Sequence, residues 1–169
     1  ELIWVLEHPT TYSAGVRFNK KDILKKNIKV IKTNRGGKIT LHNPGQKIVY
    51  FVINLNNRKR DIRKLISLVE LSVLEFLKIY KIKGNVDRKN IGIWTKNKKI
   101  SAIGIKIKKW IAYHGCSINI NNNLSLYKKI LPCGLNNDKI TSFKDLKIIK
   151  PKNIDKNLKL IFLKNLSKI

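Results

Sequence analysis

Short apolar runs alternate with polar turns over much of the chain. Residues 2–7 are apolar and aromatic and end at Pro9, which predicts a buried strand followed by a loop. Residues 48–55 are rich in β-branched and aromatic side chains and predict a second strand. Three further strands are predicted over 91–95, 99–107 and 110–120, with a polar turn between the first two.

From Asp61 the spacing of the apolar residues changes from two to three or four. The residues in this pattern are Ile62, Leu65, Ile66, Val69, Val73, Leu77 and Tyr80. They predict an amphipathic helix with Asp61 as its N-terminal cap and with Gly84 past its end. Residues 124–130 predict a short helix, and residues 157–166 predict a terminal helix that packs on the sheet.

Residues 34–46 hold three glycines and one proline, a density that predicts a loop with unusual backbone angles or close approach to a ligand. Strands are clustered, long helices are few, and no regular βαβ alternation occurs. We therefore predict the α+β class, with mixed, largely antiparallel sheets and flanking helices. The 169 residues and 19.6 kDa fit one domain over 1–169.

The chain is strongly basic, with 37 Lys and Arg against 10 Asp and Glu, a formal charge of +27. Such a charge suggests a polyanion as partner, so a basic nucleic-acid-binding module is one reading. Only six of the basic residues are Arg, the side chain favoured for reading phosphates and bases. Lysine is accompanied by many Ile and Asn residues, all with A/T-rich codons, so drift in base composition also explains the excess.

The sequence shows no signs of export, membrane insertion, a disulfide framework or a metal site. No run of about 18 apolar residues and no signal-peptide layout occur, so we expect a cytoplasmic protein without a membrane span. Cys116 and Cys133 do not form a disulfide framework, and no group has metal-ligand spacing. Because the chain begins at Glu1 inside a predicted strand, we expect that N-terminal residues are missing.

Residues 35–46 carry the densest chemical signal. Gly36 and Gly37 would let backbone N–H groups line a ligand, and Arg35 and His42 could orient polar atoms there. A glycine-rich hairpin without a ligand is the alternative. The segment matches neither the P-loop nor the dinucleotide fingerprint.

Cys133 stands between Pro132 and Gly134, a setting that could expose its thiol for attack on a carbonyl. Its alternative is simple packing, which we also expect for Cys116. Lys99 opens a predicted strand and is followed by small residues that leave room for a ligand, although it could equally be a solvated surface lysine. In the next strand His114 precedes a glycine that permits close approach.

In this order, five motifs resemble the lipoyl(octanoyl) transferases of lipoate biosynthesis, over nearly the whole chain. The motifs are Trp4-Val5-Leu6-Glu7-His8-Pro9, the segment from Arg35 to Gln46, Lys99-Ile100-Ser101-Ala102-Ile103-Gly104, Tyr113-His114-Gly115 and Pro132-Cys133-Gly134. An N-terminal strand and helix usually precede the first motif in this family. The resemblance implies the α+β fold shared with biotin and lipoate ligases.

The resemblance also implies an activity: transfer of octanoyl from octanoyl-acyl carrier protein to a specific lysine of lipoyl domains. The acceptors would be lipoyl domains of 2-oxoacid dehydrogenase complexes and the glycine cleavage H protein, with no cofactor, no ATP, no nucleic acid and no membrane, and with a monomeric enzyme. Cys133 would be the acyl-thioester nucleophile, and Lys99 would lower its pKa and shuttle protons. Substrate contacts would come from Arg35, Gly36, Gly37, Lys38, Ile39, Thr40, Leu41, His42, Ala102, Ile103, Gly104, Gly115, Cys116 and Ser117.

Two positions depart from the family's pattern, since Leu41 stands where Tyr is usual and Asn43 where Gly is usual. The fit of the substrate at this loop is therefore in question. An ATP-dependent lipoate or biotin ligase of the same fold is the nearest alternative function, but it has no need of Cys133. An inactive homologue is a further alternative, although the nucleophile and its lysine partner are both present.

Overall fold

Two β-sheets and two α-helices make up the computed structural model, which describes residues 1–88, 90–134, 137–148 and 151–169, apart from the side chains of Cys133 and Asn137. The strands are β1 (Leu2–Leu6), β2 (Thr11–Ala14), β3 (Val30–Lys32), β4 (Ile39–His42), β5 (Gln46–Asn54), β6 (Asn85–Val86), β7 (Ile93–Thr95), β8 (Lys98–Lys108) and β9 (Ile111–Asn119). The helices are α1 (Ile62–Ile79) and α2 (Ile154–Leu166). Short 3₁₀ turns are η1 (Lys20–Asp22), η2 (Leu55–Asn57), η3 (Leu124–Lys129), η4 (Pro132–Gly134) and η5 (Asn137–Lys139).

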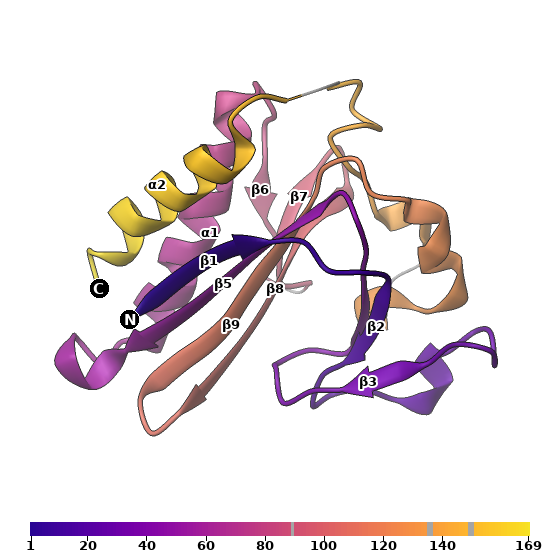
Figure 1. Cartoon of the computed structure of the whole chain (residues 1–169), viewed down its shortest axis with the longest axis horizontal. Helices are drawn as coiled ribbons and strands as arrows, with labels where there is room; N and C mark the ends of the chain where they lie inside the picture. Colours follow the sequence, from indigo (N-terminus) through magenta and orange to yellow (C-terminus); the bar gives the residue numbers. More distant parts are fainter. Residues whose placement is uncertain (89, 135–136, 149–150) are drawn as a thin grey trace.

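The larger sheet has the strand order β1-β5-β9-β8-β7-β6, and every neighbouring pair in it is antiparallel. The smaller sheet has the order β3-β2-β4, in which β2 is parallel to β3 and antiparallel to β4. Figure 1 shows both helices on one side of the larger sheet and the smaller sheet on the other side. The predicted α+β architecture with largely antiparallel, mixed sheets is confirmed.

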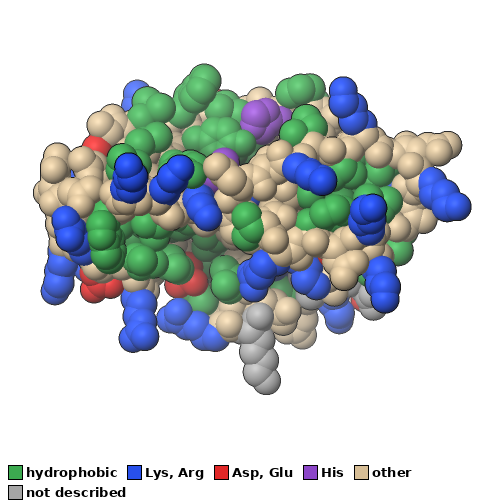
Figure 2. Space-filling model, turned by 90° about the horizontal axis from the view of Figure 1, so that it is seen from below, with side chains coloured by type: hydrophobic (Ala, Val, Ile, Leu, Met, Phe, Trp, Pro, Cys, Tyr) green, Lys and Arg blue, Asp and Glu red, His purple; other side chains and the backbone are tan. Residues whose placement is uncertain are grey.

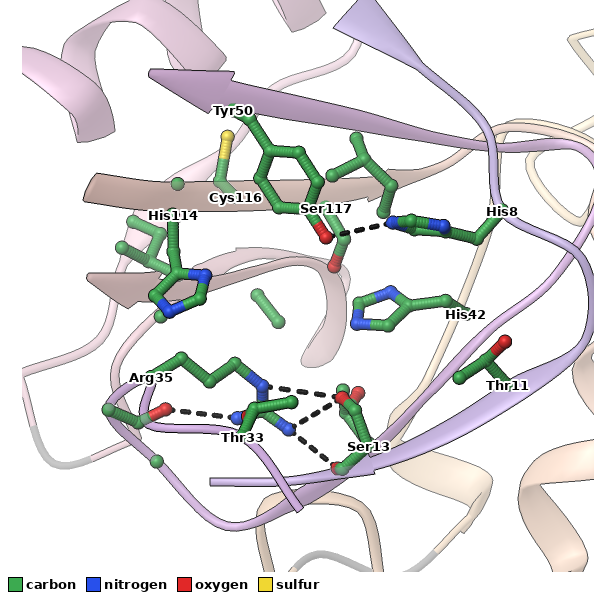
Figure 3. Close-up of a pocket in the computed structure, with 18 of the residues that line it drawn as sticks. His8, Thr11, Ser13, Thr33, Arg35, His42, Tyr50, His114, Cys116 and Ser117 are labelled. Atoms are coloured by element: carbon green, nitrogen blue, oxygen red, sulfur yellow. Dashed lines mark hydrogen bonds between the residues drawn. The ribbon is translucent and has the colours of Figure 1, made fainter. Parts of the chain in front are cut away.

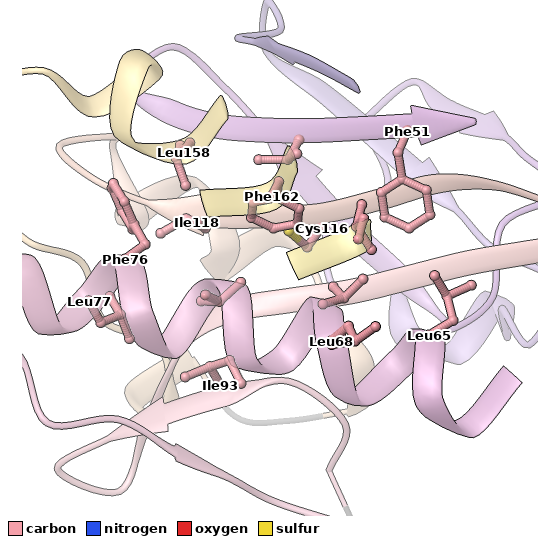
Figure 4. Close-up of a cluster of buried hydrophobic side chains, with 14 of the residues drawn as sticks. Phe51, Leu65, Leu68, Phe76, Leu77, Ile93, Cys116, Ile118, Leu158 and Phe162 are labelled. Carbon is pink, nitrogen blue, oxygen red and sulfur yellow. The ribbon is translucent and has the colours of Figure 1, made fainter. Parts of the chain in front are cut away.

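Alternation along the central strands gives the larger sheet two different faces. Val49 and Phe51 of β5 and Ile118 of β9 are buried in the main hydrophobic cluster, which α1 and α2 cover (Figure 4). The intervening residues, such as Tyr50 and Ser117, point to the opposite face, because successive side chains of a strand alternate between faces. One face of the larger sheet therefore forms the core, and its other face is turned toward the smaller sheet.

Helix α1 forms where the spacing of apolar residues predicts it. The Asp61 carboxylate accepts a hydrogen bond from the Lys64 amide at 2.9 Å, which confirms Asp61 as the N-terminal cap. The helix ends before Gly84, because Lys81 takes a left-handed φ of 58° and the Ile82 amide donates to the Leu77 carbonyl at 3.0 Å. Within the described ranges, no helix is long and apolar enough to cross a membrane.

The smaller sheet is where the predictions from sequence are incomplete. The segment 34–46 is not a loop throughout, because β4 lies inside it and alternates two buried side chains, Ile39 and Leu41, with Thr40 and His42. Strands β2 and β3 are too short for an apolar run to reveal them. The predicted helix over 124–130 is the 3₁₀ turn η3.

Candidate active site

A cavity of about 300 Å³ lies between the open face of the larger sheet and the smaller sheet. Figure 3 shows its side chains converging from β1–β2, β4, β5 and β9 and from the loop before β4. The lining residues are His8, Thr11, Ser13, Ile31, Thr33, Arg35, Gly36, Gly37, Thr40, His42, Ile48, Tyr50, Ala102, Ile103, Gly104, His114, Gly115, Cys116 and Ser117. All three histidines of the chain are among them.

Two glycines paired across β8 and β9 allow close backbone approach, Gly104 to the loop before β4 and Gly115 within the larger sheet. Gly104 faces Gly115 in the register, and a Cβ on Gly104 would lie 3.3 Å from the carbonyl oxygen of Gly36. A Cβ on Gly115 would lie 1.9 Å from the carbonyl oxygen of Val49 in β5, the neighbouring strand of the same sheet, so position 115 has no room for a side chain either. The glycine-rich loop before β4 therefore packs directly on the strand backbones, as its composition predicts.

Arg35 fixes this loop to the smaller sheet. Its guanidinium donates to the Ser13 carbonyl at 2.7 Å, to the Ser13 hydroxyl at 3.0 and 3.3 Å, and to the Gly36 carbonyl at 2.9 Å. The Gly15 amide completes the junction through a 3.1 Å bond to the Lys38 carbonyl. A cation thus lies in the cavity wall with backbone and hydroxyl oxygens as hydrogen-bond acceptors.

Hydrogen bonding assigns the tautomer of His42. The Gln46 amide nitrogen lies 2.8 Å from the Asn119 side-chain oxygen, 3.1 Å from the Tyr127 hydroxyl and 3.3 Å from the Leu41 carbonyl, so this nitrogen is the donor. The Gln46 side-chain oxygen therefore faces His42 Nδ1 at 2.8 Å and requires a proton there. Burial, together with Arg35 and His8, lowers the pKa of His42 to about 4, so the ring is neutral at pH 7. Its Nε2 is then a hydrogen-bond acceptor.

The other two histidines are also held in place. His8 Nε2 lies 2.8 Å from the Tyr50 hydroxyl, and His114 Nε2 lies 2.7 Å from the side-chain oxygen of Asn34. Burial lowers the pKa of both rings, and Arg35 contributes to the decrease at His114. The imidazoles therefore give the cavity polar but uncharged walls.

A β-bulge places Lys99 on the cavity side of the larger sheet. Ile93 pairs with Ser101 while Trp94 pairs with Lys99, so Ile100 is an extra residue in β8. In a regular strand, positions 99 and 102 would face opposite sides. Here the bulge lets Lys99 and Ala102 line the same small cavity, while Ile100 is buried in the helix-side core.

Lys99 is one of the most buried lysines of the described chain, with 4% of its surface exposed. Its Nζ donates to the Ile91 carbonyl at 2.8 Å and lies 5.3 Å from the centre of the Trp94 ring. A carbonyl oxygen and an aromatic face both stabilise an ammonium without neutralising it. The side chain is thus buried and held in one position, and it is not a solvated surface lysine.

The small cavity around Lys99 adjoins both the large one and the segment that carries Cys133. Thr40, Ala102 and Ser117 line both cavities, and Pro132 lines the small one together with Lys99. The backbone of Cys133 belongs to η4, directly after Pro132. The Cys133 thiol itself lies outside the described side chains. The described neighbours bring η4 and Lys99 to one place, although 34 positions separate Lys99 from Cys133.

Cys116 differs sharply from such a setting. Its thiol is buried in the helix-side cluster (Figure 4), and burial raises its pKa to about 12. A thiol of this pKa is protonated at pH 7 and is a poor nucleophile. Cys116 therefore packs, as its position in an apolar strand predicts.

The structure brings most of the candidate substrate-binding residues together, and separates three of them. Ile39 and Leu41 point away from the cavity into a second buried cluster, and Lys38 does not line the cavity.

The two departures from the family's pattern also lie off the cavity. Leu41 is fully buried, and Asn43 has no positive φ; its side chain donates to the Asn123 carbonyl and accepts from Asn122. Gly45, with φ of 85°, makes the turn.

Several lining residues lie outside the five sequence motifs. Thr11 and Ser13 come from β2, Ile31 from β3, and Ile48 and Tyr50 from β5. The period-two alternation of β5 assigns Ile48 and Tyr50 to one face and could have identified them. No such signal exists for the residues of β2 and β3, because both strands are short.

Known proteins share the sequence pattern of this chain. Residues 1–159 match the family model described as lipoyl protein ligase A/B catalytic domain. The chain is 42% identical over 160 residues to the octanoyltransferase of Bartonella tribocorum, which covers 86% of this chain and 65% of that protein. It is 41% identical over 156 residues to the octanoyltransferase of Wolbachia sp. subsp. Brugia malayi, covering 89% and 76%.

Solved structures show the same fold at low sequence identity. A structure of a bipartite lipoate protein ligase and its E2 lipoyl domain from Thermoplasma acidophilum matches with a TM-score of 0.71 and 14% identity, covering 98% of this chain and 69% of that chain. The chain thus spans about two thirds to three quarters of the length of these proteins.

Proposed function

The chain belongs to the lipoyl protein ligase A/B catalytic domain family, and we propose that it transfers octanoyl from octanoyl-acyl carrier protein to a specific lysine of lipoyl domains. The acyl group passes through a thioester on Cys133, with Lys99 as its proton-transfer partner. The observation that carries the proposal is the buried Lys99, which shares a cavity with Pro132 beside the nucleophile turn.

The protons balance if the resting pair is a Cys133 thiolate and a Lys99 ammonium. In the first step the thiolate attacks the thioester carbon, the bond to the carrier's sulfur breaks, and the departing thiolate takes a proton from Lys99. In the second step the neutral amine of the acceptor lysine attacks, the bond to Cys133 breaks, and the neutral Lys99 takes the proton that the amine loses. The thiolate and ammonium are then restored. The donor is already an activated thioester, so the cycle consumes no ATP.

The large cavity is suited to the acyl chain. At one end, Thr40, Ala102 and Ser117 separate it from the Lys99 cavity. Elsewhere it is lined by glycines of β8 and β9 and by isoleucines of both sheets. Burial of the chain stabilises the complex by about 0.8 kcal/mol for each CH₂. Because the three histidines are neutral, the only charge in the described wall is that of Arg35, which is hydrogen-bonded to protein oxygens.

The positive surface supports acidic partners for both half-reactions. Figure 2 shows Lys and Arg side chains spread over the face seen from below, where acidic side chains are few. The formal charge of +27 would accelerate association with acidic carrier and lipoyl domains by long-range attraction, which high salt screens.

The decisive experiment incubates the protein with octanoyl-acyl carrier protein and an apo lipoyl domain and follows both proteins by intact mass. We expect an octanoyl amide on the lipoyl domain without ATP, and a transient octanoyl adduct on this chain when the acceptor is omitted. Cys133→Ala should yield neither product.

A parallel reaction with ATP and free octanoate, without acyl carrier protein, tests the ligase alternative. Product in that reaction alone would contradict the proposal. So would full turnover, or an octanoyl adduct, in the Cys133→Ala protein.

A further inference from the structure

His114 has an unusual backbone for a residue in the middle of a strand. Its φ is 70°, the left-handed region that few residues other than glycine adopt. In the register it faces Phe51, whose side chain is in the helix-side core, so a regular strand would place His114 in that core as well. The left-handed backbone instead brings the imidazole into the wall of the large cavity (Figure 3). Strain of this kind is retained where surrounding contacts impose it.

The contact that holds the ring comes from the loop that joins two strands of the smaller sheet, β3 and β4. His114 Nε2 lies 2.7 Å from the side-chain oxygen of Asn34, and the Asn34 amide nitrogen donates to the Tyr113 hydroxyl at 3.2 Å. Asn34 lies in the loop before β4, whereas the other two residues lie in β9. The three side chains therefore form a clasp across the gap between the sheets. We call Asn34, Tyr113 and His114 the clasp.

The clasp lies at the end of the cavity away from Lys99. Ser117 lines both the large cavity and the Lys99 cavity, and His114 is three residues before it in β9. Three residues of a strand span roughly 10 Å. An extended eight-carbon chain that starts near Ser117 has a comparable length, so its terminal methyl group would reach the clasp.

This end of the cavity lies near solvent, because Asn34, which holds the His114 ring, is itself exposed. Ile31, which is 49% exposed, lines the cavity close to the same loop. A longer acyl chain could therefore leave the cavity here if the clasp opened, and would be stopped while it remains closed.

We propose that the clasp is the distal wall of the acyl cavity and sets the longest acyl chain that this protein accepts. The inference rests on the proposed function for the direction of the chain, since it takes the thioester to be at the Lys99 end. It makes Asn34 a specificity-determining residue that acts through His114 and not on the reacting atoms.

The test compares octanoyl and dodecanoyl donors in the transfer assay with the wild type, Asn34→Ala, Tyr113→Phe and Asn27→Ala. Asn34→Ala removes both hydrogen bonds, and we expect the dodecanoyl-to-octanoyl ratio of kcat/KM to rise about tenfold. Tyr113→Phe removes one bond and leaves His114 held by Asn34, so a smaller rise is expected. Asn27, another exposed asparagine outside the cavity, is the matched control and should leave the ratio at the wild-type value.

An unchanged ratio in Asn34→Ala would overturn the clasp as the distal wall, and so would an equal rise in Asn27→Ala. Calorimetric binding of octanoyl- and dodecanoyl-pantetheine to each variant in a Cys133→Ala background gives the same comparison without chemistry. If the wild type transfers no octanoyl but Asn34→Ala still gains affinity for the longer thioester, the clasp stands and the proposed function fails. If the wild type transfers octanoyl but Asn34→Ala changes neither the kcat/KM ratio nor the binding ratio, the proposed function stands and the clasp fails.

Discussion

The two faces of the larger sheet come from the same strands but are built differently. Toward α1 and α2, side chains such as Phe51 and Ile118 are almost fully buried in one hydrophobic cluster. Toward the smaller sheet, the same strands present Gly104, Gly115 and Ser117, and a cavity of about 300 Å³ is left open. Successive side chains of a strand point to opposite faces, so one strand can carry core residues on one face and cavity residues on the other. The faces should therefore respond differently to substitution.

The two cysteines provide the largest contrast. We expect Cys133→Ala to lower transfer by on the order of 10³-fold or more, because it removes the proposed nucleophile. Cys116→Ala should leave kcat/KM within about threefold and reduce the free energy of unfolding by about 1 kcal/mol, since it removes one buried sulfur from the helix-side core. Transfer assays and urea unfolding of both variants check this. Equal losses of activity would break the distinction between the faces.

Lys99 tests whether the cavity side depends on charge. Lys99→Met should reduce kcat by about 10²–10⁴-fold, the usual range for loss of acid–base assistance. The proposed mechanism pairs the Lys99 ammonium with the Cys133 thiol, so its removal should raise the thiol's pKa and with it the pH at which Cys133 alkylation reaches half its maximal rate. Lys98→Met, at an exposed neighbouring position, is the control. An unchanged alkylation profile in Lys99→Met would show that Lys99 does not act on the thiol.

Paired substitutions in the two faces test the comparison at the level of packing. Phe162→Ala opens a hole in the fully buried helix-side core and should reduce the free energy of unfolding by about 3–5 kcal/mol. The folded fraction should keep its kcat/KM. Ala102→Leu instead adds a side chain in the space between the two cavities, so it should lower kcat/KM about tenfold or more and change stability little. A large loss of stability in Ala102→Leu would mean that the open face is packed as tightly as the closed one.

How far the sequence predicts these faces depends on the length of each pattern. Helix α1 and strand β5 carry long periodic signals, and both are found where predicted. Strand β4 is only four residues long and lies in a glycine-rich segment, so the sequence does not predict it. Its place in the smaller sheet follows from its pairing with β2. The cavity position of Lys99 depends on the bulge at Ile100, and that of His114 depends on a left-handed backbone. Both are effects of three-dimensional pairing, which a periodic pattern does not encode.

The smallest effect concerns acid. Burial is the main reason that the pKa of His42 falls from its ordinary value near 6.5 to about 4. The positive charges of Arg35 and His8 contribute to the decrease, whereas the hydrogen bond to Gln46 opposes it. Between these two values the unfolded chain binds more protons than the folded one, so stability falls as the pH falls from 6.5 toward 4. Complete protonation of His42 would cost about 3 kcal/mol of stability.

His42→Asn removes this group. Between pH 7 and pH 4.5 the free energy of unfolding of the variant should therefore fall by about 2 kcal/mol less than that of the wild type. Because His8 and His114 remain in the variant, only the difference between the two proteins reports on His42. Identical pH dependence would mean that the cavity wall is as well hydrated as the surface, and the contrast between a dry polar face and a dry apolar face would be lost.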